Sequence, residues 1–226
     1  ARFHGETMNQ SDWRGDDVFG TGFIRNLIKI HRMCEVSSLY GFTRIAPSPS
    51  PFEDGLEDIK LEVKGQSLAS TIKWLPAMEQ YGEGLFLHLD DDEIRKQLSK
   101  DKASTALARL EARYRDWYNK DTANRQDYPG HEYVFAHSLS HMLIEQIALD
   151  AGYPSTSLTE RIYALKGRGS GKVSRLGILI YAAGGGSLGT LGGLLEQAVR
   201  LPQILANGVR RQHICSNDPI CFTHSE

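Results

Sequence analysis

Cysteine is scarce in this sequence, and long apolar runs are missing from it. The 226 residues include three cysteines, and Cys34 lies far from Cys215 and Cys221. This spacing excludes a disulfide framework. No stretch reaches about 18 uninterrupted apolar residues, so we expect no membrane span. No basic segment followed by an apolar one opens the chain, and the cytoplasm is therefore the expected compartment.

Recognisable enzyme motifs are also missing. The sequence shows no nucleophile paired with a base, no Walker motif and no pair of catalytic carboxylates. Its 40% hydrophobic and 24% charged residues are typical of a globular protein, and the length allows one large or two modest domains. Because the chain opens at Ala1 without a methionine, we expect it to be a piece of a longer protein.

Charge is nearly balanced overall but unevenly distributed. The net charge is −2, yet residues 161–211 hold eight Lys and Arg against the single acid Glu196, a local charge of +7. The remainder is acidic, notably at Asp90–Glu93. The C-terminal third is thus the candidate surface for a polyanion.

Hydrophobic spacing predicts an α+β fold. We expect helices over 24–39, 92–117, 131–151 and 191–201. A further helix is expected to begin at Ser155 or Ser157, with Glu160 in the capping-box position, and to continue to Leu165. Strands are expected over 42–45, 56–63, 84–89 and 176–183, the last one central in its sheet. The expected organisation is a mixed α+β region over 1–92, with short strands, followed by 93–226, a helical segment leading into an α/β unit.

A glycine-rich segment follows the last predicted strand. Gly184–Gly189 fits the pattern G-x-G-x-x-G and precedes a predicted helix. A dinucleotide site would need a carboxylate about 20 residues further on, where Arg210 and Arg211 stand instead. Three interpretations remain: a nucleotide loop, a tight turn whose N–H groups face a phosphate or a partner, and a turn with a structural role alone.

Two groups of residues could hold a metal. His137, His141 and Glu145 recur every four residues, on one face of the predicted helix 131–151. The glutamate that a zinc protease needs directly after the first histidine is replaced by Ser138, so the alternative is a pair of hydrogen-bonded histidines at a domain seam. Cys215 and Cys221, with His213 and His224 outside them, supply ligands that zinc prefers, but free cysteines are the equal alternative.

Basic residues gather around a glycine-containing loop. The candidate nucleic-acid-binding residues are Arg161, Lys166, Arg168, Lys172, Arg175, Arg210 and Arg211. Glycines between them let the backbone approach a polyanion while the long side chains neutralise phosphates. Few aromatic residues lie among them, which favours backbone contact without base stacking. A solvated basic loop is the alternative.

Several segments together resemble one family. They are Glu35–Ile45, Trp74–Phe86, His137–His141, Glu160–Tyr163, Gly177–Leu194 and Cys215–Cys221. In this order they resemble the DrmB family, the helicase-associated component of the DISARM phage-defence system. The later segments also resemble a domain that ends a group of bacterial DNA-repair helicases.

The resemblance implies a role as well as a fold. It implies a complex with a superfamily 2 helicase partner, binding of phage DNA, and a four-cysteine zinc site at the end of a helicase-associated domain over 93–226. Cys215 and Cys221 match the first cysteine pair, and the second pair would lie beyond Glu226. The resemblance makes the glycine-rich segment a fold-specific turn. We therefore expect a DNA-binding accessory subunit, with ATP hydrolysis in the partner; the alternative is a nucleotide- or metal-dependent enzyme.

Overall fold

A computed structural model of the chain describes most of its residues. The described residues are 3–14, 21–39, 41–42, 66–67, 73–120, 128–152, 154–166, 173–183 and 193–212. The predicted strand over 56–63 and residues 43–45 of the strand predicted over 42–45 lie outside these ranges.

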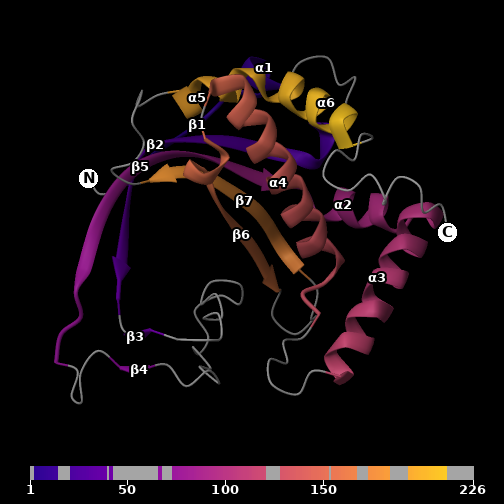
Figure 1. Ribbon diagram of the computed structural model, residues 1–226. Coiled ribbons are helices and arrows are strands. Elements are labelled where there is room, and N and C mark those ends of the chain that lie inside the picture. Colours follow the sequence, from indigo (N-terminus) through magenta and orange to yellow (C-terminus); the bar gives the residue numbers. More distant parts are fainter. Residues whose placement is uncertain are drawn as a thin grey trace.

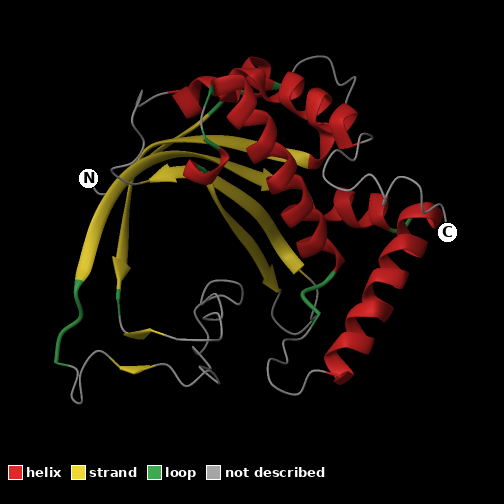
Figure 2. Ribbon diagram, in the orientation of Figure 1, coloured by secondary structure: helices red, strands yellow, loops and turns green. Residues whose placement is uncertain are grey.

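An arched five-stranded sheet forms the body of the fold (Figures 1 and 2). Its order is β1-β2-β5-β7-β6, and every neighbouring pair is antiparallel. The strands are β1 His4–Thr7, β2 Ile24–Ser38, β5 Ala77–Leu89, β6 Thr159–Lys166 and β7 Val173–Ala183. With several helices beside this sheet, the α+β class predicted from the sequence is confirmed.

Two of the predicted strands are confirmed, and the helix predicted over 24–39 is wrong. The strands expected over 84–89 and 176–183 lie within β5 and β7, and β7 has a neighbour on each side. The segment expected as a helix over 24–39 is instead the 15-residue strand β2. Its apolar side chains alternate between the two faces of the sheet, and a register shift between Ile24 and Asn26 brings Ile24 to the same face as Leu27. A second shift lies between Ile30 and Met33.

Helices cover one face of the sheet, and the main core lies between them (Figure 1). Helix α4, His131–Ala151, has the predicted bounds and ends at Gly152, whose φ of 74° is the left-handed conformation that favours glycine. Around it lie α1 Gln10–Trp13, α5 Gly193–Glu196, the 3-10 turn η3 Gln197–Arg200 and α6 Leu201–Gln212. These last three elements replace the single helix predicted over 191–201.

The helix predicted over 92–117 is two helices. α2, Asp91–Leu98, ends at Ser99, and α3, Asp101–Lys120, begins after Lys100 and leaves the body of the fold (Figure 1). Acidic residues occupy the first turn of α2. Asp90 caps α2 by accepting a hydrogen bond of 3.0 Å from the backbone N–H of Glu93.

Asp90 also forms an ion pair with Arg25, the second residue of β2. Its Oδ2 lies 2.9 Å from Arg25 Nε. This hydrogen bond, followed by that from Glu93, lowers the pKa of Asp90 from 3.8 to about 2. A carboxyl group whose folded pKa is depressed stabilises the fold above its unfolded pKa, and that contribution disappears as the pH falls through the folded value.

Asp90→Ala is expected to lower the free energy of unfolding by about 1–2 kcal/mol at neutral pH, because both the cap and the ion pair are removed. The difference from the parent protein should shrink as the pH falls from about 4 towards 2, where Asp90 takes up its proton. Urea unfolding at a series of pH values measures this. A difference that stays constant over that interval would contradict the assigned role of the charge.

The helix predicted from Ser155 or Ser157 to Leu165 is also wrong. Only the 3-10 turn η2, Ser155–Ser157, is helical, and β6 follows it directly. Glu160 therefore stands on a strand, opposite Ile180 of β7, rather than in a capping box. Two short strands, β3 Gly41–Phe42 and β4 Gln66–Ser67, form a separate antiparallel pair, and β3 includes the first residue of the strand predicted over 42–45.

The boundary expected between residues 92 and 93 stays a prediction. In the described residues, strands from both sides of that position are hydrogen-bonded in one sheet, since β5 pairs with β7. None of the helices in the described part of the chain has the length and apolar character needed to cross a lipid bilayer.

Candidate functional site

Two histidines of α4 stand on its solvent-exposed side. The opposite side of the helix is apolar and packs into the main core through residues such as Leu139, Leu143 and Ile147. His137 and His141 are one helical turn apart, so their side chains lie one above the other. Their side chains are 46% and 62% exposed. The helix therefore holds both imidazoles at the edge of the fold, within reach of solvent.

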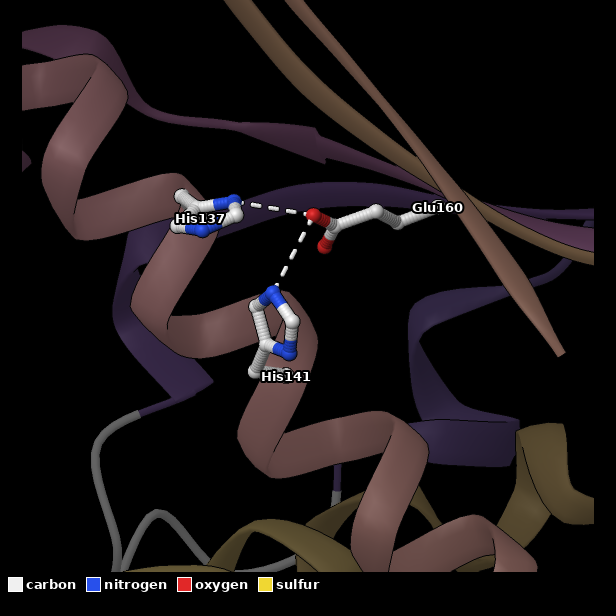
Figure 3. Close-up of side chains that lie close together, drawn as sticks. All are labelled: His137, His141 and Glu160. Carbon is white, nitrogen blue, oxygen red and sulfur yellow. Dashed lines mark ion pairs between the residues drawn. The ribbon is translucent and has the colours of Figure 1, made fainter. Parts of the chain in front are cut away.

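A carboxylate from the neighbouring strand completes the group (Figure 3). Glu160 lies on the same face of β6 as Ile162 and Ala164, which pack against the main core. Helix α4 packs against β6 on this face. The Oε1 atom of Glu160 is 2.8 Å from His137 Nδ1 and 3.5 Å from His141 Nε2. One carboxylate oxygen is thus shared between two imidazoles that come from a different element.

Neighbouring side chains hold this arrangement in place. Ser140 is fully buried, and its hydroxyl oxygen contacts the second oxygen of Glu160 and lies 2.7 Å from the carbonyl oxygen of His137. The ring of Tyr133 stacks on that of His137 at an interplanar angle of 13°. The His137 and His141 rings stand at 80° with their centroids 4.4 Å apart. Contacts on several sides therefore orient both the carboxylate and the imidazoles.

This His-His-Glu cluster of His137, His141 and Glu160 is the group of potential metal ligands found among the described residues. One ligand atom from each residue lies within 4.8 Å of the other two. The structure groups the two histidines with Glu160 and not with Glu145, and metal binding by these residues stays a prediction. Glu145 is exposed and belongs to no such group in the described part of the chain, whereas Glu160 comes from a segment that had been predicted as a helix.

The predicted nucleic-acid-binding residues that the structure describes do not gather in one place. The main core contains Ile162 and Ala164 of β6 and Leu176 and Ile178 of β7. Because side chains alternate along a strand, Arg161 and Arg175 point to the opposite face of the sheet, called here the second sheet face. The second sheet face carries Ile30, Phe86, Leu179 and Tyr181, with Tyr163 and Leu165 beside the two arginines.

Arg210 and Arg211 lie elsewhere, at the end of α6. That helix packs into the main core through Leu201, Ile204 and Leu205, so these two arginines lie on the helical side of the sheet and not on the second sheet face. Lys166 is the last residue of β6, opposite Val173. Arg168 and Lys172 lie outside the described residues.

Aromatic rings are more numerous on the second sheet face than the sequence indicated. Phe86 and Tyr163 meet edge to face with centroids 5.9 Å apart. The buried Tyr181 donates a hydrogen bond of 2.9 Å from its hydroxyl to Glu35. Burial, followed by that hydrogen bond, raises the pKa of Tyr181 to about 12. Two arginines thus stand beside aromatic and apolar side chains on one face.

Other predicted sites lie outside the described residues, and one buried carboxylate was not anticipated. Cys215 and Cys221 belong to residues 213–226, and Gly184–Gly189 to residues 184–192; neither segment is described. Glu83 of β5 is 5% exposed and accepts a hydrogen bond of 3.1 Å from the backbone N–H of Leu194 in α5. In the sequence, an acid between two glycines, Gly82 and Gly84, directly before an apolar run was the available signal for this contact.

Comparison with known proteins gives one clear relationship. No protein-family model matches the chain. The chain is 31% identical over 206 residues to the DISARM protein DrmB of Bacillus paralicheniformis. This similarity covers 88% of the chain but 34% of that protein. The chain is therefore similar to DISARM protein DrmB over most of its own length and spans about a third of the length of that relative.

Proposed function

We propose that this chain is part of a component of a DISARM antiphage defence system, and that it acts there as a DNA-binding scaffold beside a superfamily 2 helicase. The observation that carries the proposal is the 31% identity to DISARM protein DrmB over 88% of the chain. The resemblance found in the sequence points to the same family. Such a component works in the cytoplasm, where invading DNA arrives.

The distribution of charge supports contact with DNA. Arg161 and Arg175 lie on the second sheet face, on adjacent strands. Lys166 ends the first of these strands, and the connection to the next strand carries Arg168 and Lys172 in the sequence. Arginine side chains on neighbouring strands can neutralise phosphates without reading bases. The second sheet face near β6 and β7 is therefore the proposed DNA contact.

The role of a scaffold is proposed because the sequence shows no motif for ATP hydrolysis. The sequence shows no Walker motif, so ATP hydrolysis is assigned to the helicase partner. The chain would then guide DNA that the partner moves, rather than move the DNA itself.

A salt titration tests the proposed DNA contact. Full-length protein, with and without its helicase, is titrated against duplex and single-stranded DNA at several salt concentrations. Arg161→Ala with Arg175→Ala should reduce the slope of log K against log[salt] by about 0.7–0.9 for each phosphate that is no longer neutralised. Arg168→Ala with Lys172→Ala should act in the same direction.

The matched control replaces Arg109 and Arg113 with alanine. Both are exposed arginines on α3, so the control removes the same charge from a different element. It should leave the slope unchanged. Equal slopes for the parent protein and for both test pairs, in the presence of the helicase, would move the DNA contact to another part of the complex and overturn the proposal.

A further inference from the structure

We propose that His137, His141 and Glu160 form a binding site for a divalent transition-metal ion of the Zn²⁺ class. The inference does not depend on the proposed role in defence. It differs from the cysteine site that the sequence resemblance implies, because it uses imidazole and carboxylate ligands and lies at the α4–β6 contact.

The chemistry of the ligands selects the class of ion. Imidazole nitrogen suits zinc, copper, nickel and iron, whereas calcium and magnesium prefer oxygen ligands. Two histidines and one carboxylate are a ligand set that open zinc sites use, with a further position left for water. The high exposure of His137 and His141 gives an ion access from solvent and leaves room for that water.

The spacing of the ligand atoms fits such an ion. An ion about 2.1 Å from each of three ligands in tetrahedral geometry holds the ligand atoms about 3.4 Å apart. Glu160 Oε1 already lies 2.8 Å from His137 Nδ1 and 3.5 Å from His141 Nε2, and the two nitrogens are within 4.8 Å of each other. Small rotations of exposed imidazoles would bring all three atoms to bonding distance.

The surroundings of the cluster favour a formed site over a chance contact. Glu160 is only 20% exposed, and the fully buried Ser140 contacts the oxygen that does not face the histidines. Hydrogen bonds from such outer groups orient metal ligands and strengthen binding. Tyr133, stacked on His137, orients the other side of the cluster. The carboxylate also supplies the negative charge that offsets part of the charge of the ion.

Zinc titration of the metal-depleted full-length protein, in competition with a chromophoric chelator, tests the site. The parent protein should bind one equivalent of Zn²⁺ that His137→Ala, His141→Ala and Glu160→Gln each weaken by about tenfold or more, since loss of an outer partner alone already costs that much. His31→Ala is the matched control, because His31 lies 3.1 Å from Glu6 but outside the cluster. Glu145→Gln controls for a carboxylate on the same helix. Neither control should change the affinity.

Cobalt separates this site from the cysteines. Co²⁺ in the proposed site should give visible bands without the near-ultraviolet charge-transfer band of a thiolate ligand, and Cys215→Ser with Cys221→Ser should leave these bands unchanged. Far-ultraviolet circular dichroism verifies that each variant is folded. Two results would overturn the proposal: zinc affinity that is equal in the parent and the three cluster variants, or metal binding that disappears only when the cysteines are replaced.

Discussion

Leu143→Ala is expected to lower the free energy of unfolding by about 2–5 kcal/mol, which is a large part of the stability of a typical domain. Leu143 lies in the middle of α4 with no exposed surface, in the same buried cluster as Ile178 and Ile180 of β7. The truncation removes apolar contacts and leaves a cavity between the helix and the sheet. Urea unfolding of the parent and the variant measures the loss.

Leu149 supplies the control for this substitution. It belongs to the same helix but is 57% exposed, so Leu149→Ala removes the same atoms from a side chain that the described structure leaves in solvent. Its effect should stay within about 0.5 kcal/mol. If both substitutions cost the same, α4 does not bury the face that the structure assigns to it.

Gly177→Ala should destabilise the protein by about 1–3 kcal/mol through overpacking. Gly177 lies on β7, and the ring of Phe86 from β5 covers it. A Cβ atom there would stand 2.6 Å from Phe86 Cζ and 3.3 Å from the carbonyl oxygen of Leu87. The ring would have to move, and with it the edge-to-face contact with Tyr163. Thermal or urea unfolding reports the change in stability.

A double-mutant cycle identifies the cause of that loss. Phe86→Leu removes the ring atoms nearest to the new methyl group, so the double variant Gly177→Ala, Phe86→Leu should be more stable than the sum of the two single effects predicts. Additive effects would indicate that the cost at Gly177 arises from the backbone and not from the ring.

The sequence pattern predicted some elements well because their local signals agree with their tertiary packing. Helix α4 has an apolar face, a left-handed glycine at its end and Pro154 beyond, and its bounds were predicted residue for residue. The apolar runs 84–89 and 176–183 were identified as strands because each one is short, rich in aliphatic residues and bounded by glycine or charged residues. In each case the local pattern and the tertiary packing favour the same structure.

The wrong predictions share one physical cause, which is pairing with a distant strand. In β2 the register shift between Ile24 and Asn26 places Ile24 and Leu27, three residues apart, in the same cluster, and this spacing imitates a helix. Ile28 and Ile30 then belong to the cluster on the other face of the sheet. In residues 155–165 a serine and Glu160 imitate a capping box, yet hydrogen bonding to β7 decides the structure. A short stretch of sequence does not include the strand that it pairs with. Neither strand could therefore be predicted from its own residues.

The candidate metal site was predictable only in its helical half. His137 and His141 are four residues apart, and helical periodicity alone brings them together. Glu160 joins them only because β6 packs beside α4, a contact between elements that follows from the sheet order. The same limit applies to the basic residues, since strand alternation separates Arg161 and Arg175 from Arg210 and Arg211.

The pairing of β5 with β7 has a consequence for synthesis on the ribosome. Between these two strands the sequence contains α2, α3, α4 and β6. One edge of β5 therefore has no partner until these elements and β7 have been translated. At usual elongation rates this interval is on the order of ten seconds. During this interval the nascent chain exposes an unpaired strand edge that contains the apolar residues Leu85 and Leu87. Such an edge can pair with another chain and aggregate unless a chaperone binds it first.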